Sequence, residues 1–336
     1  MTTGALPRRG WLCVLALVAW VGQSALAASI PPFAPGDLLL MDSNASAGNG
    51  QLFKINRTTG AATPLGTGFG DEPWSLVLQD SGTLLVADAS GEDVRRLDMS
   101  NGTWTPVSSG GLLRYPSGAM VSHSANSVLV ASGGNIVNVN TVTGAQTVFA
   151  NYGQHGTNDA WGMTRAPDGS LLVTDLDVPG TIVRIEPSGA SSVFSSGGLL
   201  YSTTGIAVLP DGTVAVGNRA DVAGRDSIVR IDPLTGAQSY LAPPGSFTYV
   251  TALTLDTDGN LLVSDGGSAS RGRVAKVRVS DGQITTFSND AKLASPAGLI
   301  IVPRVPEPSA VALLFLPACS AAFARRRQGS NGSVAR

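Results

Sequence analysis

Leu171-Leu172-Val173-Thr174-Asp175 is the stretch of sequence that decides the fold, because close variants of it recur along the chain. Each copy is an apolar run that ends in a short polar side chain, and consecutive copies are 43 to 47 residues apart. The other five copies begin at Leu38, Leu84, Val128, Val214 and Leu261. A period of this length, built from short strands, is typical of a β-propeller in which each repeat forms one blade.

Each repeat carries further strand and turn signals around this run. A second run with alternating polarity follows it, as in Ile182-Val183-Arg184-Ile185, and such alternation marks a strand with one buried face. Asp-Gly and Thr-Gly pairs, such as Asp168-Gly169 and Thr235-Gly236, stand where hairpin turns are needed. We therefore predict an all-β fold, a six-bladed β-propeller that spans residues 28–304.

The two ends of the repeat region complement each other. Gly36 leads directly into the second strand of the first repeat, which therefore lacks an innermost strand of its own. Near the other end, Gly298-Leu299-Ile300-Ile301-Val302 is similar to innermost strands such as Ser75-Leu76-Val77-Leu78 but has no repeat of its own. We expect this C-terminal strand to complete the first blade, which closes the ring and removes an open edge.

The repeat pattern resembles the NHL and SMP-30/gluconolactonase-like group of six-bladed propellers. The resemblance is carried by segments such as residues 167–175, with the sequence Pro-Asp-Gly-Ser-Leu-Leu-Val-Thr-Asp, and it covers residues 35–303. It implies the fold, whereas the activities of such propellers range over lactonases, lyases, synthases, scaffolds and binding proteins. Enzymes of the SMP-30 group hold a metal in the channel with a Glu, an Asn and an Asp, and no such set aligns here residue by residue.

Loop lengths predict where a ligand would bind. The long connections join second to third strands and one blade to the next, and the alternation of strand direction places both classes on one face. Carboxylate and amide oxygens at the channel mouth could hold calcium, and tryptophans there could stack on a sugar. The ordinary alternative is a solvated acidic rim with tryptophans packed between blades. The candidate residues are Asp71, Glu72, Trp74, Asn158, Asp159 and Trp161.

Two other patterns are better explained by structure than by ligand binding. A short polar side chain at the end of a second strand commonly accepts hydrogen bonds from backbone N–H groups of a loop. The residues 256–260, Asp-Thr-Asp-Gly-Asn, match part of a calcium loop but lack its later Glu, so we expect a hairpin turn. The polar residues that end second strands are Asp42, Asp88, Asp175, Asn218 and Asp265.

Several kinds of chemistry have little support in the sequence. His123 and His155 are the only histidines, and the only cysteines, Cys13 and Cys319, lie outside the propeller region. A Ser-His-Asp set would need His155 near Asp159 and a serine from another blade, and there is no Gly-x-Ser-x-Gly motif. Residues 28–308 hold all 24 acidic residues but only 16 of the 22 basic ones, which argues against nucleic acid as a partner. We predict no catalytic residues and no resident metal or other cofactor, with calcium as the one candidate.

The N-terminus has the features of a secretory signal peptide. Arg8 and Arg9 precede an apolar core over residues 11–22, and Ala25-Leu26-Ala27 forms a small-residue cleavage site. We expect cleavage after Ala27, which assigns residues 1–27 to the signal and implies export across the inner membrane.

The C-terminal segment, residues 305–336, resembles a PEP-CTERM sorting signal. Val305-Pro306-Glu307-Pro308 is followed by an uncharged run over residues 309–324 and by a basic stub over residues 325–336 that opens with Arg325, Arg326 and Arg327. Sixteen residues form a helix of about 24 Å, slightly short of the hydrocarbon core of about 30 Å, so the run is a marginal single transmembrane segment. The arginines favour a cytoplasmic end. In that family an exosortase of Gram-negative bacteria reads and processes the tag.

Two functions of different classes follow. The first is a surface or extracellular-matrix protein whose propeller binds exopolysaccharide or another surface protein without catalysis, because sorting tags of this family are associated with biofilm production. The second is a metal-dependent lactonase, hydrolase or lyase of the SMP-30-like type. In both, the protein is anchored transiently in the membrane and then reaches the cell surface or the medium.

Overall fold

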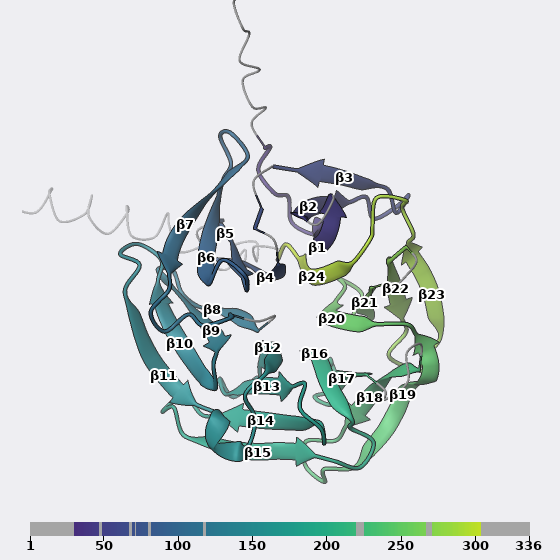
Figure 1. Cartoon of the computed structure of the whole chain (residues 1–336). Coiled ribbons are helices and arrows are strands. Elements are labelled where there is room, and N and C mark those ends of the chain that lie inside the picture. The colour runs from purple at the N-terminus through teal and green to yellow at the C-terminus, as the bar shows by residue number, and fades with distance from the viewer. Residues whose placement is uncertain are drawn as a thin grey trace, which may run out of the picture.

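The computed structural model describes residues 30–303, apart from residues 47–48, 67–68, 71, 80–81, 117–118, 220–224 and 267–270. This part of the chain forms six four-stranded antiparallel sheets arranged radially around a central axis (Figure 1). The predicted six-bladed propeller is therefore confirmed. The predicted signal peptide and sorting segment lie outside the described residues, as does the candidate Asp71. Between Ile30 and Pro303, no described helix is long and apolar enough to cross a membrane.

We number the blades from one to six in chain order, and in each blade the innermost strand comes first. Blade one consists of β24 (Pro296–Ile301), β1 (Leu38–Ser46), β2 (Asn49–Ile55) and β3 (Ala62–Leu65), and blade two of β4 (Pro73–Leu78), β5 (Leu84–Asp88), β6 (Asp93–Asp98) and β7 (Thr103–Ser109). Blade three consists of β8 (Met120–Ser124), β9 (Ser127–Ser132), β10 (Asn135–Asn140) and β11 (Gln146–Asn151), and blade four of β12 (Ala160–Arg165), β13 (Leu171–Asp175), β14 (Thr181–Ile185) and β15 (Ser191–Ser196). Blade five consists of β16 (Ser202–Val208), β17 (Val214–Arg219), β18 (Asp226–Ile231) and β19 (Gln238–Phe247), and blade six of β20 (Val250–Leu255), β21 (Leu261–Asp265), β22 (Arg273–Val277) and β23 (Ile284–Ser288). A single 3-10 turn, η1 (Gly153–His155), follows β11.

The ring closes as the sequence predicts. The C-terminal strand β24 pairs antiparallel with β1, and Leu39 lies opposite Ile300. Beyond the paired residues, the backbone N–H of Ser43 donates to the oxygen of Ser295 at 3.0 Å. Because the last strand supplies the missing inner strand of blade one, all six described blades have four strands.

The hydrophobic core lies between the blades. The second strands are the most deeply buried elements, and all five residues of β5, β13 and β21 are buried. Six apolar clusters of buried side chains each combine residues from two neighbouring blades. This explains the two patterns in the sequence: second strands are covered on both faces and read as continuous apolar runs, whereas outer strands alternate.

Short polar turns join the first to the second strand in each blade. In the turn before β13, Gly169 has a φ of 86°, which favours glycine, and Asp168 Oδ1 accepts the backbone N–H of Ser170 at 3.0 Å. Asp256 plays the same part before β21, where it accepts the N–H groups of Asp258 and Asn260 at 2.8 and 2.9 Å. The expected hairpin turn at residues 256–260 is confirmed.

The two faces of the propeller differ in what they carry. We call the face with the connections between second and third strands and between blades the loop face, and the opposite face, with the short turns, the turn face. Each innermost strand starts at the loop face and ends at the turn face, as the antiparallel order requires.

Candidate functional site

Two tryptophans meet across the loop-face end of the channel. Trp74 is the second residue of β4 and Trp161 the second residue of β12, and their ring centroids lie 4.8 Å apart at an interplanar angle of 57°. Trp161 Nε1 donates a hydrogen bond to the backbone oxygen of Thr251 on β20 at 3.0 Å. The pair therefore links blades two, four and six across the axis.

Small residues bring the inner strands close together beside this pair. A Cβ atom at Gly162 would lie 2.5 Å from the oxygen of Thr204, and one at Gly205 would lie 2.5 Å from the nitrogen of Leu253. No side chain fits there, so neighbouring inner strands pack backbone to backbone. Position 162, directly after Trp161 in β12, is consequently restricted to glycine. The channel is narrow where these inner strands meet.

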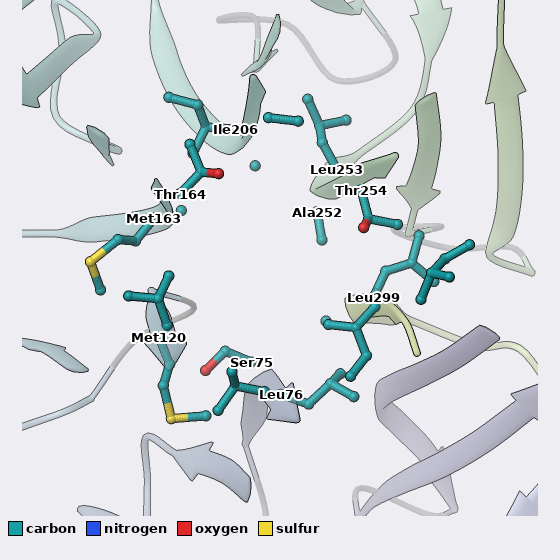
Figure 2. A pocket seen from close by; sticks show the side chains of 18 of the residues that line it. Ser75, Leu76, Met120, Met163, Thr164, Ile206, Ala252, Leu253, Thr254 and Leu299 are labelled. Carbon is teal, nitrogen blue, oxygen red and sulfur yellow. The ribbon is translucent and has the colours of Figure 1, made fainter. Parts of the chain in front are cut away.

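The channel continues from the tryptophans toward the turn face, with a volume of about 650 Å³. Figure 2 shows the apolar side chains that surround it, one from each innermost strand. These six residues are Leu76, Met120, Met163, Ile206, Leu253 and Leu299. All but Met163 are buried, so this ring belongs largely to the packing between blades.

Tyr115, on the connection between β7 and β8, lies at the loop-face mouth of the channel. Its backbone has a φ of 54°, in the left-handed region that a tyrosine rarely adopts, and its side chain is 53% exposed. Tyr115 Oη donates a hydrogen bond to Glu72 Oε2 at 3.2 Å. Partial burial raises the pKa of Tyr115, and the negative charges of Glu72 and Asp159 raise that pKa further. Tyr115 thus binds Glu72 and lies near enough to Asp159 to sense its charge.

Asp159, directly before β12, is the second predicted carboxylate near Tyr115. Burial raises its pKa, the nearby charge of Asp177 adds to the rise, and Arg219 opposes it. The guanidinium of Arg219 lies over the ring of Tyr249, 4.1 Å from the centroid, in a cation–π contact. The loop face therefore gathers aromatic rings, carboxylates and the guanidinium of Arg219 around the channel end. We call Glu72, Tyr115, Asp159, Arg219 and Tyr249 the mouth cluster.

Asn158 does not belong to this cluster. Its side-chain oxygen lies against Gly134 and Gly153, where added Cβ atoms would approach it to 3.1 and 3.0 Å. Its backbone N–H donates to Asp177 Oδ2 at 3.4 Å. Of the predicted site residues, the structure thus brings together Glu72, Trp74, Asp159 and Trp161 and turns Asn158 toward the neighbouring blade.

The mouth does not offer a full metal-binding set in the described part of the chain. Among those residues, no group of three or more His, Cys, Asp or Glu side chains is placed to hold a metal ion. Asp88 and Asp175, the nearest acids at strand ends, accept loop N–H groups instead, from Glu72 at 3.3 Å and from Asp159 at 3.0 Å. The described residues therefore do not fit the Glu, Asn and Asp set of the SMP-30 group.

The polar residues that end second strands are structural, as expected. Each accepts backbone N–H groups from the loop that precedes the inner strand of its own blade. Asn218 Oδ1, for example, accepts the N–H of Tyr201 at 2.7 Å, and Asp265 Oδ1 accepts the N–H groups of Thr248 and Tyr249 at 2.9 Å each. In blade three, Ser132 Oγ takes this role with the N–H of Arg114 at 2.6 Å.

The two histidines lie away from the mouth cluster. His123 is exposed on β8, where its ring contacts Phe149 at a centroid distance of 5.5 Å. His155 Nε2 is 3.0 Å from the hydroxyl of Ser191 on the outermost strand β15, and that hydroxyl donates to the oxygen of Asn151 at 2.9 Å. The serine therefore ties blades three and four together.

Sequence reasoning missed three members of the mouth cluster: Tyr115, Arg219 and Tyr249. Tyr115 and Tyr249 stand in the long between-blade connections that mark the loop face, and Arg219 directly follows the polar end of a second strand. Nothing in the repeat pattern distinguishes them from other loop residues. The positive φ of Tyr115 is a property of the folded backbone alone.

Comparison with known proteins supports the fold and leaves the activity open. No family model matches the chain, and no curated protein sequence matches it either. The chain is similar to a structure from a nidogen/laminin complex, with 15% identity, a TM-score of 0.64, and coverage of 80% of this chain and 98% of that one. It is similar to TolB from Acinetobacter baumannii, with 15% identity, a TM-score of 0.60, and coverage of 80% and 67%. A gluconolactonase from Xanthomonas campestris matches with 15% identity, a TM-score of 0.56, and coverage of 80% and 89%. The chain is thus a six-bladed β-propeller with structural neighbours that include the gluconolactonase type.

Proposed function

We propose that this protein is an exported surface or extracellular-matrix protein whose propeller binds a glycan or protein ligand at the loop face without catalysing a reaction. The observation that carries the proposal is the mouth cluster above the Trp74–Trp161 pair. The exposed ring of Tyr115 and the partly exposed ring of Tyr249 lie near carboxylates and a guanidinium, which suits stacking on sugar rings and hydrogen bonding with hydroxyl groups.

The same arrangement argues for binding rather than for chemistry in the channel. The indoles of Trp74 and Trp161 lie across the loop-face end, so a ligand of the mouth cluster would rest on them rather than enter. The carboxylates at strand ends accept backbone N–H groups, and the acids that remain near Tyr115 and Asp159 are Glu72, Asp159 and Asp177. Carboxylates next to aromatic rings suit recognition of a polar polymer.

The sorting of the protein is part of the proposal. Residues 1–27 direct export, and residues 305–336 hold the chain in the inner membrane until an exosortase processes it and releases the propeller. Exopolysaccharide or a surface protein is then the partner. Replacing Pro306, Glu307 and Pro308 by alanine is expected to leave the chain in the inner-membrane fraction, and unchanged release would contradict this account.

The binding proposal is tested with the mature protein on a microarray of defined bacterial and plant oligosaccharides, followed by calorimetry with the ligands found. We expect Tyr115→Ala to weaken binding about tenfold, because a stacked aromatic ring contributes on the order of 1 kcal/mol beyond its buried area. Tyr240→Ala is the matched control, since Tyr240 is 43% exposed on the outermost strand β19. Equal loss in both variants, or none in either, would overturn the assignment of the site.

A metal-dependent lactonase or hydrolase is the second candidate. The fold similarity to a gluconolactonase and the raised pKa of Asp159 favour it. In that case calcium would raise the melting temperature of the protein, and Glu72→Gln or Asp159→Asn would abolish the increase. A melting temperature that does not respond to any divalent ion would count against this candidate and leave the binding function in place.

A further inference from the structure

Both ends of the described chain emerge on the turn face. The innermost strand β24 runs from the loop face to the turn face, and the residue after it, Val302, donates its N–H to the oxygen of Asp37 at 2.9 Å. At the other end, the N–H of Ile30 donates to the oxygen of Met99 in the turn between β6 and β7 at 2.8 Å. Pro303 lines the turn-face opening of the channel, so the chain leaves the propeller close to its axis.

Little chain separates this exit point from the apolar run of the sorting segment. Only residues 304–308 lie between Pro303 and the run that begins at Ser309. Five residues span at most about 17 Å when fully extended. While the apolar run is in the bilayer, the centre of the turn face is therefore within about 17 Å of the membrane surface.

This short distance favours the orientation with the turn face toward the bilayer. Four strands at a spacing of about 4.8 Å, together with the channel inside them, give a radius on the order of 20 Å, so a disc standing on its edge would need the linker to be fully extended. A disc with its loop face down would add the height of a six-residue inner strand, about 20 Å, and the loops beyond it. The turn face is therefore the surface that the linker brings nearest to the bilayer.

The chemistry of the turn face allows this approach. Several of its basic side chains are paired with acids of the same face, as in Lys54–Asp37 and Lys276–Asp256, each at 2.6 Å. Others donate to neutral oxygens, as Arg57 does to Thr257 Oγ1 at 2.8 Å and Arg165 to the backbone oxygen of Ser122 at 3.2 Å. Headgroup contact would therefore not leave these charges unpaired, and a short tether gives even weak contacts a local concentration in the millimolar range.

We propose that the turn face is a membrane-facing surface that lies against the phospholipid headgroups of the inner membrane while the precursor is anchored, and that it presents the mouth cluster away from the bilayer. This inference rests on the anchoring role of the sorting segment in the proposed function. It adds that ligand binding at the loop face and attachment at the turn face take place on opposite sides of the same disc.

The test uses single cysteines in the full chain, expressed in a Gram-negative host that lacks exosortase. With Cys319→Ser and removal of the signal peptide that carries Cys13, the chain has no other thiol. Ala125→Cys places a thiol on the turn face, in the exposed turn between β8 and β9, and Ser90→Cys places one in the exposed loop between β5 and β6 on the loop face. A membrane-impermeant maleimide is applied to spheroplasts, and the labelling rates are compared with those of chains that carry thirty extra Gly/Ser residues after Pro303.

We expect the short tether to slow the labelling of Ala125→Cys at least fivefold relative to the long tether and to leave the labelling of Ser90→Cys unchanged. If the chain is in the membrane fraction but the labelling of Ala125→Cys does not depend on tether length, the turn face is not membrane-facing and the anchor stands. If the chain is absent from the membrane fraction, the anchoring role itself is wrong, and the inference fails with it.

Discussion

Aspartates on the two faces of the propeller carry out similar tasks in opposite electrostatic settings. On the turn face, Asp211 accepts the hydroxyl and the N–H of Thr213 and pairs with Arg230, and these contacts lower its pKa. On the loop face, Asp175 also accepts two backbone N–H groups, but burial raises its pKa to about 6 and the charge of Asp177 adds to the rise. Asp211 therefore stabilises the fold when it is charged, whereas the charged form of Asp175 is disfavoured by its burial.

The largest expected effect comes from substitution of Asp42, which accepts hydrogen bonds where the ring closes. Asp42 is fully buried, and its carboxylate accepts the N–H groups of Ala294 and Ser295 at 2.8 and 3.0 Å. Asp42→Ala removes charged hydrogen bonds and leaves partly buried donors without acceptors, so we expect a loss of about 3 to 5 kcal/mol in the free energy of unfolding. Denaturant titration followed by circular dichroism measures it.

Asp232→Ala is the turn-face counterpart. Asp232 Oδ1 accepts the N–H groups of Leu234 and Thr235 at 2.8 and 3.1 Å, but solvent can replace it there. We expect a much smaller loss than for Asp42→Ala. Equal losses of unfolding free energy in the two variants would show that a capping aspartate contributes the same whether or not it lies at the ring closure.

The pH dependence of stability gives an effect of intermediate size. The pKa of Asp175 rises from 3.8 to about 6 on folding, so between these values the folded state binds more protons than the unfolded state. Its contribution to the free energy of unfolding is therefore present below pH 4 and declines as pH rises to about 6. In Asp175→Asn, the free energy of unfolding is expected to fall by about 1 to 3 kcal/mol less over this pH range than in the unchanged protein.

Asp211→Asn should change the free energy of unfolding at lower pH, on the acidic side of the same pH dependence. Because folding lowers the pKa of Asp211, its contribution is present above the unfolded pKa and is lost as pH falls below about 4. Thermal unfolding from pH 3 to pH 8 separates the two effects. An unchanged slope between pH 4 and 6 in Asp175→Asn would contradict the difference between the faces.

The smallest expected effect concerns Tyr115. Its left-handed backbone costs about 1 kcal/mol for a residue with a Cβ atom, so Tyr115→Gly relieves strain while it removes the ring and the contact with Glu72. We expect the free energy of unfolding to stay the same or rise by about 1 kcal/mol while ligand binding weakens. A clear loss of stability would mean that Tyr115 serves the fold rather than the mouth cluster.

Much of the fold could be predicted because propeller blades are repeats with a fixed polarity pattern. Buried second strands read as apolar runs, and a surplus strand near residue 300 together with a missing one near residue 36 allows one simple closure. The strand-end caps followed from the local hydrogen bonding of short polar side chains.

The candidate site was harder to predict from the sequence because it depends on how separate blades meet. The contact between Trp74 and Trp161 requires two indoles from blades two and four to bend toward the axis, and no local pattern fixes that direction. Asn158 is a neighbour of Asp159 in sequence, yet its side chain packs against Gly134 in blade three. Tyr115 and Arg219 reach the mouth through loop conformations that vary from blade to blade.

The pairing of β24 with β1 also sets the order in which the protein can fold. The hydrogen bonds between Asp42 and Ser295 join residues 253 positions apart, so the ring remains open until almost the whole propeller has been synthesised. Contacts of such long range make folding slow, and a chain that folds slowly is suited to crossing a membrane unfolded. In the sorting route we propose, the segment that completes blade one is followed after a few residues by the anchor. The ring would then close last, on the far side of the membrane, next to the bilayer that still holds the chain.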